Sequence, residues 1–230
     1  MRAVGIGALA TALAVVPVRF AAPAVPAPAL LVALVAAALV PLTALAVVRR
    51  RTNRGHHLPG DEVTLLRAGL VGACAGQAGL VLLGELSPQI WPLFVLALVA
   101  WLLDGLDGIV ARRTGTASEA GGRFDVEIDA VLLLALSAVV ATVVGWWVLG
   151  IGMLRYLWVL TLLAAPRLDR PLAPRPSRRR IAGLQGGVLV ASLAPSVPDG
   201  VVWPACALAL ALLCFSFARD GVHAQRTQPS

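Results

Sequence analysis

Four aspartates stand at helical spacing between long apolar segments of this chain. They are Asp104, Asp107, Asp125 and Asp129. The first two are three residues apart and the last two are four apart, so each pair lies on one face of a helix. A carboxylate at membrane depth costs about 2.5 kcal/mol or more, which makes such residues candidates for a functional site. Four carboxylates need compensating positive charge, and a metal ion is the obvious source.

The residues around the aspartates favour phosphoryl transfer. Carboxylate oxygens suit hard cations such as Mg²⁺, Mn²⁺ or Ca²⁺. Gly108 carries no side chain, so a bulky group can approach the backbone beside the ions. Arg112 adds a fixed cation that is suited to phosphate. Two metals can hold both the attacking and the leaving oxygen, and a further carboxylate can accept the proton of an attacking hydroxyl.

The composition predicts an integral membrane protein. Hydrophobic residues make up 59% of the 230 residues and charged residues only 13%, whereas a soluble domain carries roughly 25% charged residues. The net charge of +7 comes entirely from arginine, because the sequence contains no lysine. Loops on the positive side of a membrane and anionic headgroups explain this charge better than nucleic acid does.

Up to eight apolar segments could each cross a bilayer, which takes about 20 residues. They are 3–20, 28–48, 63–84, 90–112, 125–147, 150–166, 181–198 and 201–218. We expect the first segment to be a retained helix, and a cleaved signal peptide is the alternative. The expected fold is all-α. It comprises an N-terminal extension of one or two helices with a linker (1–60), a six-helix membrane domain (61–218) and a short polar tail (219–230).

The arginines predict how the helices are oriented. Most of them fall in three segments between the apolar stretches, around 49–54, 112–123 and 167–180, and the intervening turns carry almost no basic residue. The positive-inside rule therefore places these segments in the cytoplasm, with both chain termini if all eight spans hold. The aspartates would then lie at the cytoplasmic ends of two adjacent helices of a plasma-membrane protein. Tryptophans would lie near the opposite ends, at Trp91, Trp146, Trp147 and Trp203.

The stretch from Asp104 to Asp129 reads D-x2-D-G-x2-A-R-x8-G-x3-D-x3-D with every fixed position filled. This pattern resembles the signature of the CDP-alcohol phosphotransferase family, and the six spans from about 63 to 218 are similar to its six-helix core. The resemblance implies that a phosphatidyl group is transferred from a CDP-linked lipid, such as CDP-diacylglycerol, to an alcohol with release of CMP. It also implies a homodimer whose lipid substrate enters sideways from the bilayer.

The resemblance also implies roles for the motif residues. Asp104, Asp107 and Asp125 would bind two divalent ions, Mg²⁺ or Mn²⁺, and Asp129 would be both a ligand and the general base. The residues expected to contact cytidine diphosphate are Gly108, Ala111, Arg112 and Gly121. Val126-Glu127 stands where many relatives carry a small hydroxyl residue. This difference and the two extra N-terminal spans leave the acceptor open among glycerol 3-phosphate, inositol phosphate and a second lipid.

Several other charged residues could line the site. Arg67 is either an interfacial arginine that extends toward the headgroups or a residue that contacts substrate phosphate. Arg155 lies within an apolar segment and is expected to pair with Glu127 or with an aspartate of the cluster, and binding of an acceptor phosphate is the alternative. The run Arg178, Arg179 and Arg180 either fixes the topology or attracts an anionic acceptor or nucleotide.

Two other functions are compatible with intramembrane aspartates. A prenyltransferase of the membrane also uses aspartates and Mg²⁺ on a diphosphate, but its motifs usually lie far apart, whereas both pairs fit within 26 residues here. A cation transporter or channel would place carboxylates near mid-membrane, often in inverted repeats. The aspartates of this chain lie near helix ends, and the sequence shows no such repeat.

Overall fold

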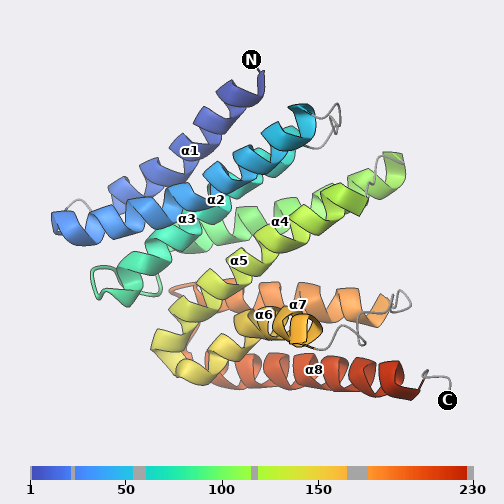
Figure 1. Cartoon of the computed structure of the whole chain (residues 1–230). Helices are drawn as coiled ribbons and strands as arrows, with labels where there is room; N and C mark the ends of the chain where they lie inside the picture. The colour runs from blue at the N-terminus through green and yellow to red at the C-terminus, as the bar shows by residue number, and fades with distance from the viewer. Residues whose placement is uncertain (1, 22–23, 54–60, 115–118, 165–175, 227–230) are drawn as a thin grey trace.

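The computed structural model describes residues 2–21, 24–53, 61–114, 119–164 and 176–226. Side chains are described within these ranges except at 2–7, 21, 51–53, 61, 106–114, 119–124, 162, 164, 176–179 and 220–226. The described ranges form helices and connecting turns without a strand (Figure 1). The helices are α1 (Arg2–Ala21), α2 (Ala27–Asn53), α3 (Asp61–Leu82), α4 (Trp91–Thr114), α5 (Glu119–Val144), the short 3-10 helix η1 (Trp146–Val148), α6 (Leu149–Ala164), α7 (Pro176–Ser192) and α8 (Asp199–Arg226).

The all-α membrane fold that the sequence predicts is confirmed. Within the part of the chain that the structure describes, four helices are long and apolar enough to cross a bilayer, and they lie in α2, α3, α5 and α8. Shorter apolar helices lie in α1, α4 and across η1 and α6. Every predicted span has a helical counterpart, although several boundaries differ from the prediction. The helix α7 ends at Ser192 rather than near 198, and α8 continues to Arg226 rather than ending near 218.

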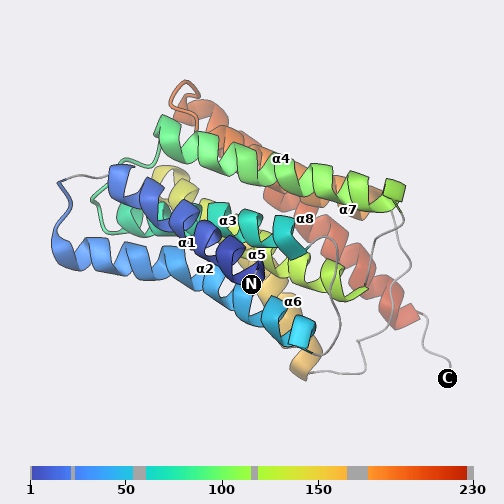
Figure 2. The same ribbon diagram turned by 90° about the horizontal axis from the view of Figure 1, so that it is seen from above.

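Consecutive helices run in opposite directions, so alternate connections lie at the same end of the bundle (Figures 1 and 2). The chain reverses after α3 and after α5 at glycines with positive φ, Gly84 at 77° and Gly145 at 119°, a conformation that glycine adopts without steric cost. These turns share one end with the α7–α8 turn. The last turn of α4 and the first turns of α3, α5 and α7 lie at the other end, which bears the aspartates.

Tryptophans gather at the end opposite the aspartates, as the sequence predicts. Trp91 begins α4, Trp146 and Trp147 follow α5, and Trp203 lies in the first turns of α8. The rings of Trp147 and Trp203 meet edge to face with centroids 5.7 Å apart. Trp91, Trp146 and Trp203 are each more than half exposed. Exposed tryptophans at the ends of membrane helices are typical of the interface between lipid tails and water.

Small residues join the two N-terminal helices to α3. A methyl group added at Gly69 would overlap the backbone carbonyl of Ala10 in α1, and one added at Gly72 would overlap the carbonyl of Ala37 in α2. At Gly76 it would lie 2.7 Å from Val18 and 2.8 Å from the carbonyl of Ala33. The glycines of this segment therefore permit close helix packing. We call this contact, made by Gly69, Gly72 and Gly76 of α3, the glycine seam.

The opposite side of α3 faces α4 and α5 and carries the polar residues of the site. Arg67, Val71, Cys74 and Ala78 follow helical spacing and are all buried. They pack toward α4 and α5, which bring the aspartates. The helix α3 therefore lies between the N-terminal helices and the two aspartate-bearing helices (Figure 2).

Candidate active site

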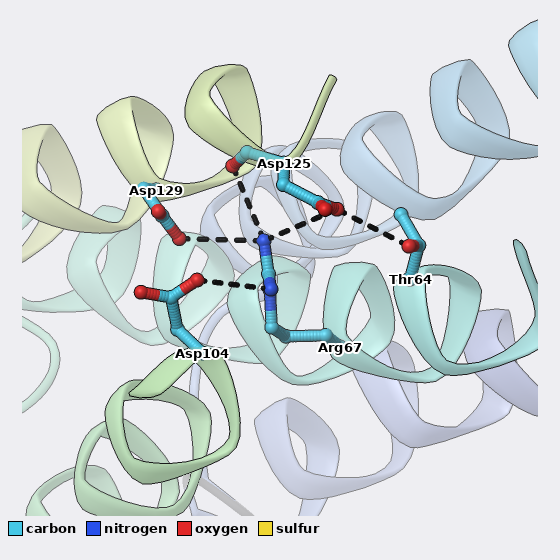
Figure 3. Close-up of polar contacts among 5 residues, drawn as sticks. All are labelled: Thr64, Arg67, Asp104, Asp125 and Asp129. Atoms are coloured by element: carbon cyan, nitrogen blue, oxygen red, sulfur yellow. Dashed lines mark hydrogen bonds and ion pairs between the residues drawn. The ribbon is translucent and has the colours of Figure 1, made fainter. Parts of the chain in front are cut away.

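Three of the four aspartates converge on one arginine at the end of the bundle. The guanidinium of Arg67, from α3, lies 3.0 Å from a carboxylate oxygen of Asp104 on α4. Its Nη2 atom lies 3.5 Å from Asp125 and 3.4 Å from Asp129, both on α5. Figure 3 shows the three carboxylates arranged around the guanidinium. The predicted meeting of the two aspartate-bearing helix faces is thus observed for these residues.

A second set of contacts ties Asp125 to α3. Thr64 donates a hydrogen bond to Asp125 Oδ1 at 3.2 Å, and Arg67 Nη2 donates one to the Asp125 backbone carbonyl at 3.2 Å. Thr64 and Arg67 are three residues apart, so both lie on the same face of α3. Asp125 and Asp129 are one turn apart on α5 and face them (Figure 3). Two helices that are far apart in sequence are therefore held in one register by polar contacts.

The arginine is buried beneath carboxylates that remain partly open. The Arg67 side chain is 2% exposed, whereas those of Asp104, Asp125 and Asp129 are 39%, 37% and 33% exposed. A buried charge is costly unless it is paired and hydrogen-bonded, and these carboxylates supply the pairing. Their exposed parts leave carboxylate groups accessible at this end of the bundle.

The donor chemistry of the cluster fits a divalent cation. Carboxylate oxygens from two helices, each about one-third exposed, are ligands that Mg²⁺ and Mn²⁺ prefer. Among the side chains that the structure describes, however, no three acidic, histidine or cysteine groups are placed so that they could hold a metal ion. The guanidinium of Arg67 lies between the three carboxylates instead, and the side chain of Asp107 lies outside the described residues.

The side chain of Arg67 points into the bundle, unlike that of an interfacial arginine. Of the two alternatives for Arg67, extension toward the headgroups is wrong, because its guanidinium is buried and turned toward α4 and α5. Contact with substrate phosphate stays a prediction, and the pairing of Arg67 with the aspartates was not predicted. The spacing of Thr64 and Arg67 carried a signal, since it places two polar side chains on one face of an otherwise apolar helix.

Arg155 pairs with Glu127, as the sequence predicts. Arg155 Nη2 on α6 contacts a carboxylate oxygen of Glu127 on α5. Arg155 is 34% exposed and Glu127 is 55% exposed, so solvent weakens this pair. Glu127 lies two residues from both Asp125 and Asp129, which turns it away from the cluster. The pair therefore links α5 to α6 beside the site without joining the three aspartates.

The remaining predicted site residues are placed by their helices alone. Asp107, Gly108, Ala111 and Arg112 belong to α4, and Gly121 belongs to α5. Arg178 and Arg179 begin α7, and the side chains at all these positions lie outside the described residues. Arg180 is described and exposed. Gln185 is buried and donates a hydrogen bond at 2.9 Å to the Ala209 carbonyl, which joins α7 to α8.

The fold and the site define an α-helical integral membrane protein with a carboxylate cluster at one end. A family model described as CDP-alcohol phosphatidyltransferase matches residues 61–215. The chain belongs to the CDP-alcohol phosphatidyltransferase family. No curated protein and no solved structure matches the chain.

Membership of this family fixes the class of reaction. The family transfers a phosphatidyl group from a CDP-alcohol, and its members usually need a divalent metal. The matched residues begin with α3 and end within α8, so they contain the complete aspartate motif. The helices α1 and α2 lie outside the matched residues. The prenyltransferase and transporter interpretations lose their support, because neither accounts for this family match.

Proposed function

We propose that this protein transfers the phosphatidyl group of a CDP-linked lipid, such as CDP-diacylglycerol, to the hydroxyl group of an alcohol in phospholipid synthesis and releases CMP. The observation that carries the proposal is the convergence of Asp104, Asp125 and Asp129 at one end of the bundle. These are the positions at which the family motif of this chain carries its acidic residues.

The proposed reaction is a single exchange at phosphorus. The acceptor oxygen forms a bond to the phosphorus that bears the lipid, and the bond from that phosphorus to the bridging oxygen breaks. CMP leaves with the bridging oxygen and its electron pair. The acceptor proton goes to the carboxylate of Asp129, the proposed general base. Asp129 is one-third exposed, so an acceptor hydroxyl can reach it from the open side of the cluster.

We assign the metal-binding role to Asp104, Asp107, Asp125 and Asp129. Two Mg²⁺ or Mn²⁺ ions bound there would offset the charge that develops on the attacking and leaving oxygens. Gly108, Ala111, Arg112 and Gly121 are proposed to contact the cytidine diphosphate. The position of the first three in the last turns of α4 supports this assignment, because they follow the aspartates on the same helix.

The arginines support an anionic acceptor. Arg178, Arg179 and Arg180 lie in the first turns of α7, where the helix dipole favours negative rather than positive charge. An anionic group beside them would relieve this conflict. Arg155 could contribute to the same attraction, because its pair with Glu127 is partly exposed. An acceptor that carries a phosphate is therefore favoured over an uncharged alcohol.

We place the protein in the plasma membrane, with the aspartate end toward the cytoplasm, and propose that it acts as a homodimer. The exposed Arg49, Arg50 and Arg180 at that end support the orientation. Arg19, near the end of α1, is an exception at the opposite end.

The proposed function is tested with membranes that contain the protein and labelled CDP-diacylglycerol. Glycerol 3-phosphate, inositol phosphate, a second phospholipid and uncharged glycerol are offered separately, and the lipid product and CMP are identified. We expect stoichiometric CMP and one new lipid, with a phosphate-bearing acceptor preferred. Hydrolysis without transfer to any of the acceptors would contradict the proposal.

A second test concerns the metal. We expect an excess of chelator to stop CMP release and Mg²⁺ or Mn²⁺ to restore it, because one arginine leaves the aspartate cluster with a net negative charge that repels a diphosphate. The control adds the same chelator already saturated with Mg²⁺. Undiminished transfer in excess free chelator would contradict the metal role of the aspartates.

A further inference from the structure

The carboxylates of the cluster already have a cation of their own. Arg67 approaches Asp104, Asp125 and Asp129 at 3.0, 3.5 and 3.4 Å. Its own side chain is only 2% exposed, so water cannot solvate its charge. Three carboxylates held this close would repel one another without an intervening positive charge. The guanidinium therefore stabilises the arrangement of the cluster in the state that the structure describes.

The same oxygen atoms are needed by a divalent ion. Mg²⁺ and Mn²⁺ bind carboxylate oxygens at about 2.1 Å, so an ion between the aspartates must come close to the guanidinium that now lies there. A guanidinium and a divalent ion repel each other strongly at such separations. Both cations cannot keep their full set of contacts with the same three carboxylates.

We propose that Arg67 is the counter-cation of the metal-free site, and that it competes with divalent ions for Asp104, Asp125 and Asp129. Arg67 is thus a positioning residue that holds the carboxylates together before metal binds and lowers the affinity of the site for metal. This inference rests on the metal role assigned to these aspartates under the proposed function.

A further contact shows how Arg67 could remain in place when metal binds. Arg67 Nη2 donates a hydrogen bond to the backbone carbonyl of Asp125 at 3.2 Å, which no metal-bound carboxylate has to give up. The carboxylate groups can rotate toward an ion while this backbone contact persists. Thr64 also bonds the Asp125 carboxylate but carries no charge, so it supports the position of Asp125 without opposing a cation.

The test measures two quantities on purified full-length protein in detergent: the Tm of the metal-free protein and the Mn²⁺ dissociation constant, the latter from the electron paramagnetic resonance signal of free Mn²⁺. Arg67→Met keeps a long side chain but removes the charge. We expect its metal-free Tm to fall by about 5 °C or more. We expect its Mn²⁺ affinity to rise roughly 10- to 100-fold, the range over which groups around a metal site change affinity.

Thr64→Val is the matched control. It removes a neighbouring contact to Asp125 and leaves every charge in place, so it should lower the Tm slightly without strengthening Mn²⁺ binding. Arg67→Lys carries the test if Arg67→Met cannot be purified. The shorter ammonium group reaches fewer carboxylates, and its Mn²⁺ affinity should lie above that of the wild type.

The opposite changes in stability and affinity distinguish competition from a purely structural role, which would weaken both. Unchanged or weaker Mn²⁺ binding by the Arg67 variants, beside normal binding by the wild type, would overturn this inference and leave the proposed function intact. A wild-type protein that binds no Mn²⁺ would overturn the metal role and this inference together.

Discussion

Asp129 holds the position at which the proposed chemistry can be tested most directly. It lies one helical turn after Asp125 and faces the same guanidinium, yet it remains one-third exposed (Figure 3). The spacing of the motif predicted that Asp104, Asp125 and Asp129 would meet. It could not predict that Arg67 pairs with all three, because this pairing depends on how α3 packs against α4 and α5, whereas the spacing of Thr64 and Arg67 indicated only a polar face on α3.

We expect Asp129→Asn to abolish turnover while metal binding is partly retained. The amide cannot accept the acceptor proton, and the loss of a general base costs about 100-fold or more in rate. Asp104, Asp107 and Asp125 remain as ligands. CMP release and Mn²⁺ binding are measured on the same preparation.

Glu85→Gln is the control for this variant. Glu85 is an exposed acidic residue in the α3–α4 turn, at the opposite end of the bundle, so the same loss of a carboxylate there should leave CMP release unchanged. If Asp129→Asn released CMP at the wild-type rate, the assignment of the base would be wrong.

At the scale of helices, the apolar segments of the sequence predicted the number of long helices correctly. They placed the C-terminal end of α7 too far along the chain. The apolar pattern continues through residues 193–198, but successive tight hydrogen bonds replace the helix there, from Leu193 to Val190 and from Val197 to Ala194. Pro195 and Pro198 lie within this stretch, and the residue before a proline avoids the helical conformation. Proline, not a change in hydropathy, ends the helix.

The glycine seam predicts unequal effects of the same substitution within one helix. Gly72→Ala should lower the free energy of unfolding by about 1–3 kcal/mol, the usual cost of overpacking, because the new methyl group meets the backbone of Ala37. Gly79→Ala meets nothing closer than 3.9 Å. It should be neutral or stabilising by up to about 1 kcal/mol, since alanine favours helix. Thermal unfolding in detergent compares the two, and equal effects would show that the seam is looser than described.

A second pair of glycines links helix packing to the site. A methyl group at Gly186 of α7 would lie 2.5 Å from the indole nitrogen of Trp101, whereas at Gly183 it would meet nothing within 4 Å. Trp101 precedes Asp104 by three residues on α4, so a displaced ring moves the helix that bears this carboxylate.

We therefore expect Gly186→Ala to reduce CMP release about tenfold or more, since small misplacements of reacting groups are costly. Gly183→Ala should retain wild-type activity. Rates are compared at saturating lipid, with the Tm as a check that both variants remain folded. Equal activity of the two variants would show that the packing of α7 against Trp101 does not affect the geometry of the site.

For the whole molecule, the alternating helix directions (Figure 1) place the motif aspartates and most described arginines at one end. Four of the six tryptophans, Trp91, Trp146, Trp147 and Trp203, lie at the other end. The sequence predicted this polarity from arginine positions. The helix order agrees with this polarity, because consecutive helices run in opposite directions and every second connection returns to the same end of the bundle.

The proposed orientation, with the aspartate end in the cytoplasm, predicts which positions an impermeant thiol reagent can reach in intact cells. Ser87→Cys lies in the exposed α3–α4 turn, and Arg50→Cys is exposed near the end of α2. In a background in which the exposed Cys214 is replaced by serine, we expect Ser87→Cys to react in intact cells and Arg50→Cys only after permeabilisation. The reverse labelling pattern would show that the protein has the opposite orientation in the membrane.

The close fit of α1 and α2 against α3 also affects how the protein can be shortened. Cutting the chain back to the family-matched residues would remove two helices from a surface on which Gly69, Gly72 and Gly76 leave the backbone of α3 uncovered. Lipid tails would fill the resulting groove along α3 poorly. The same surface on another copy of the truncated protein would pack against it more closely. The truncated protein should therefore aggregate in detergent even though every motif residue is still present.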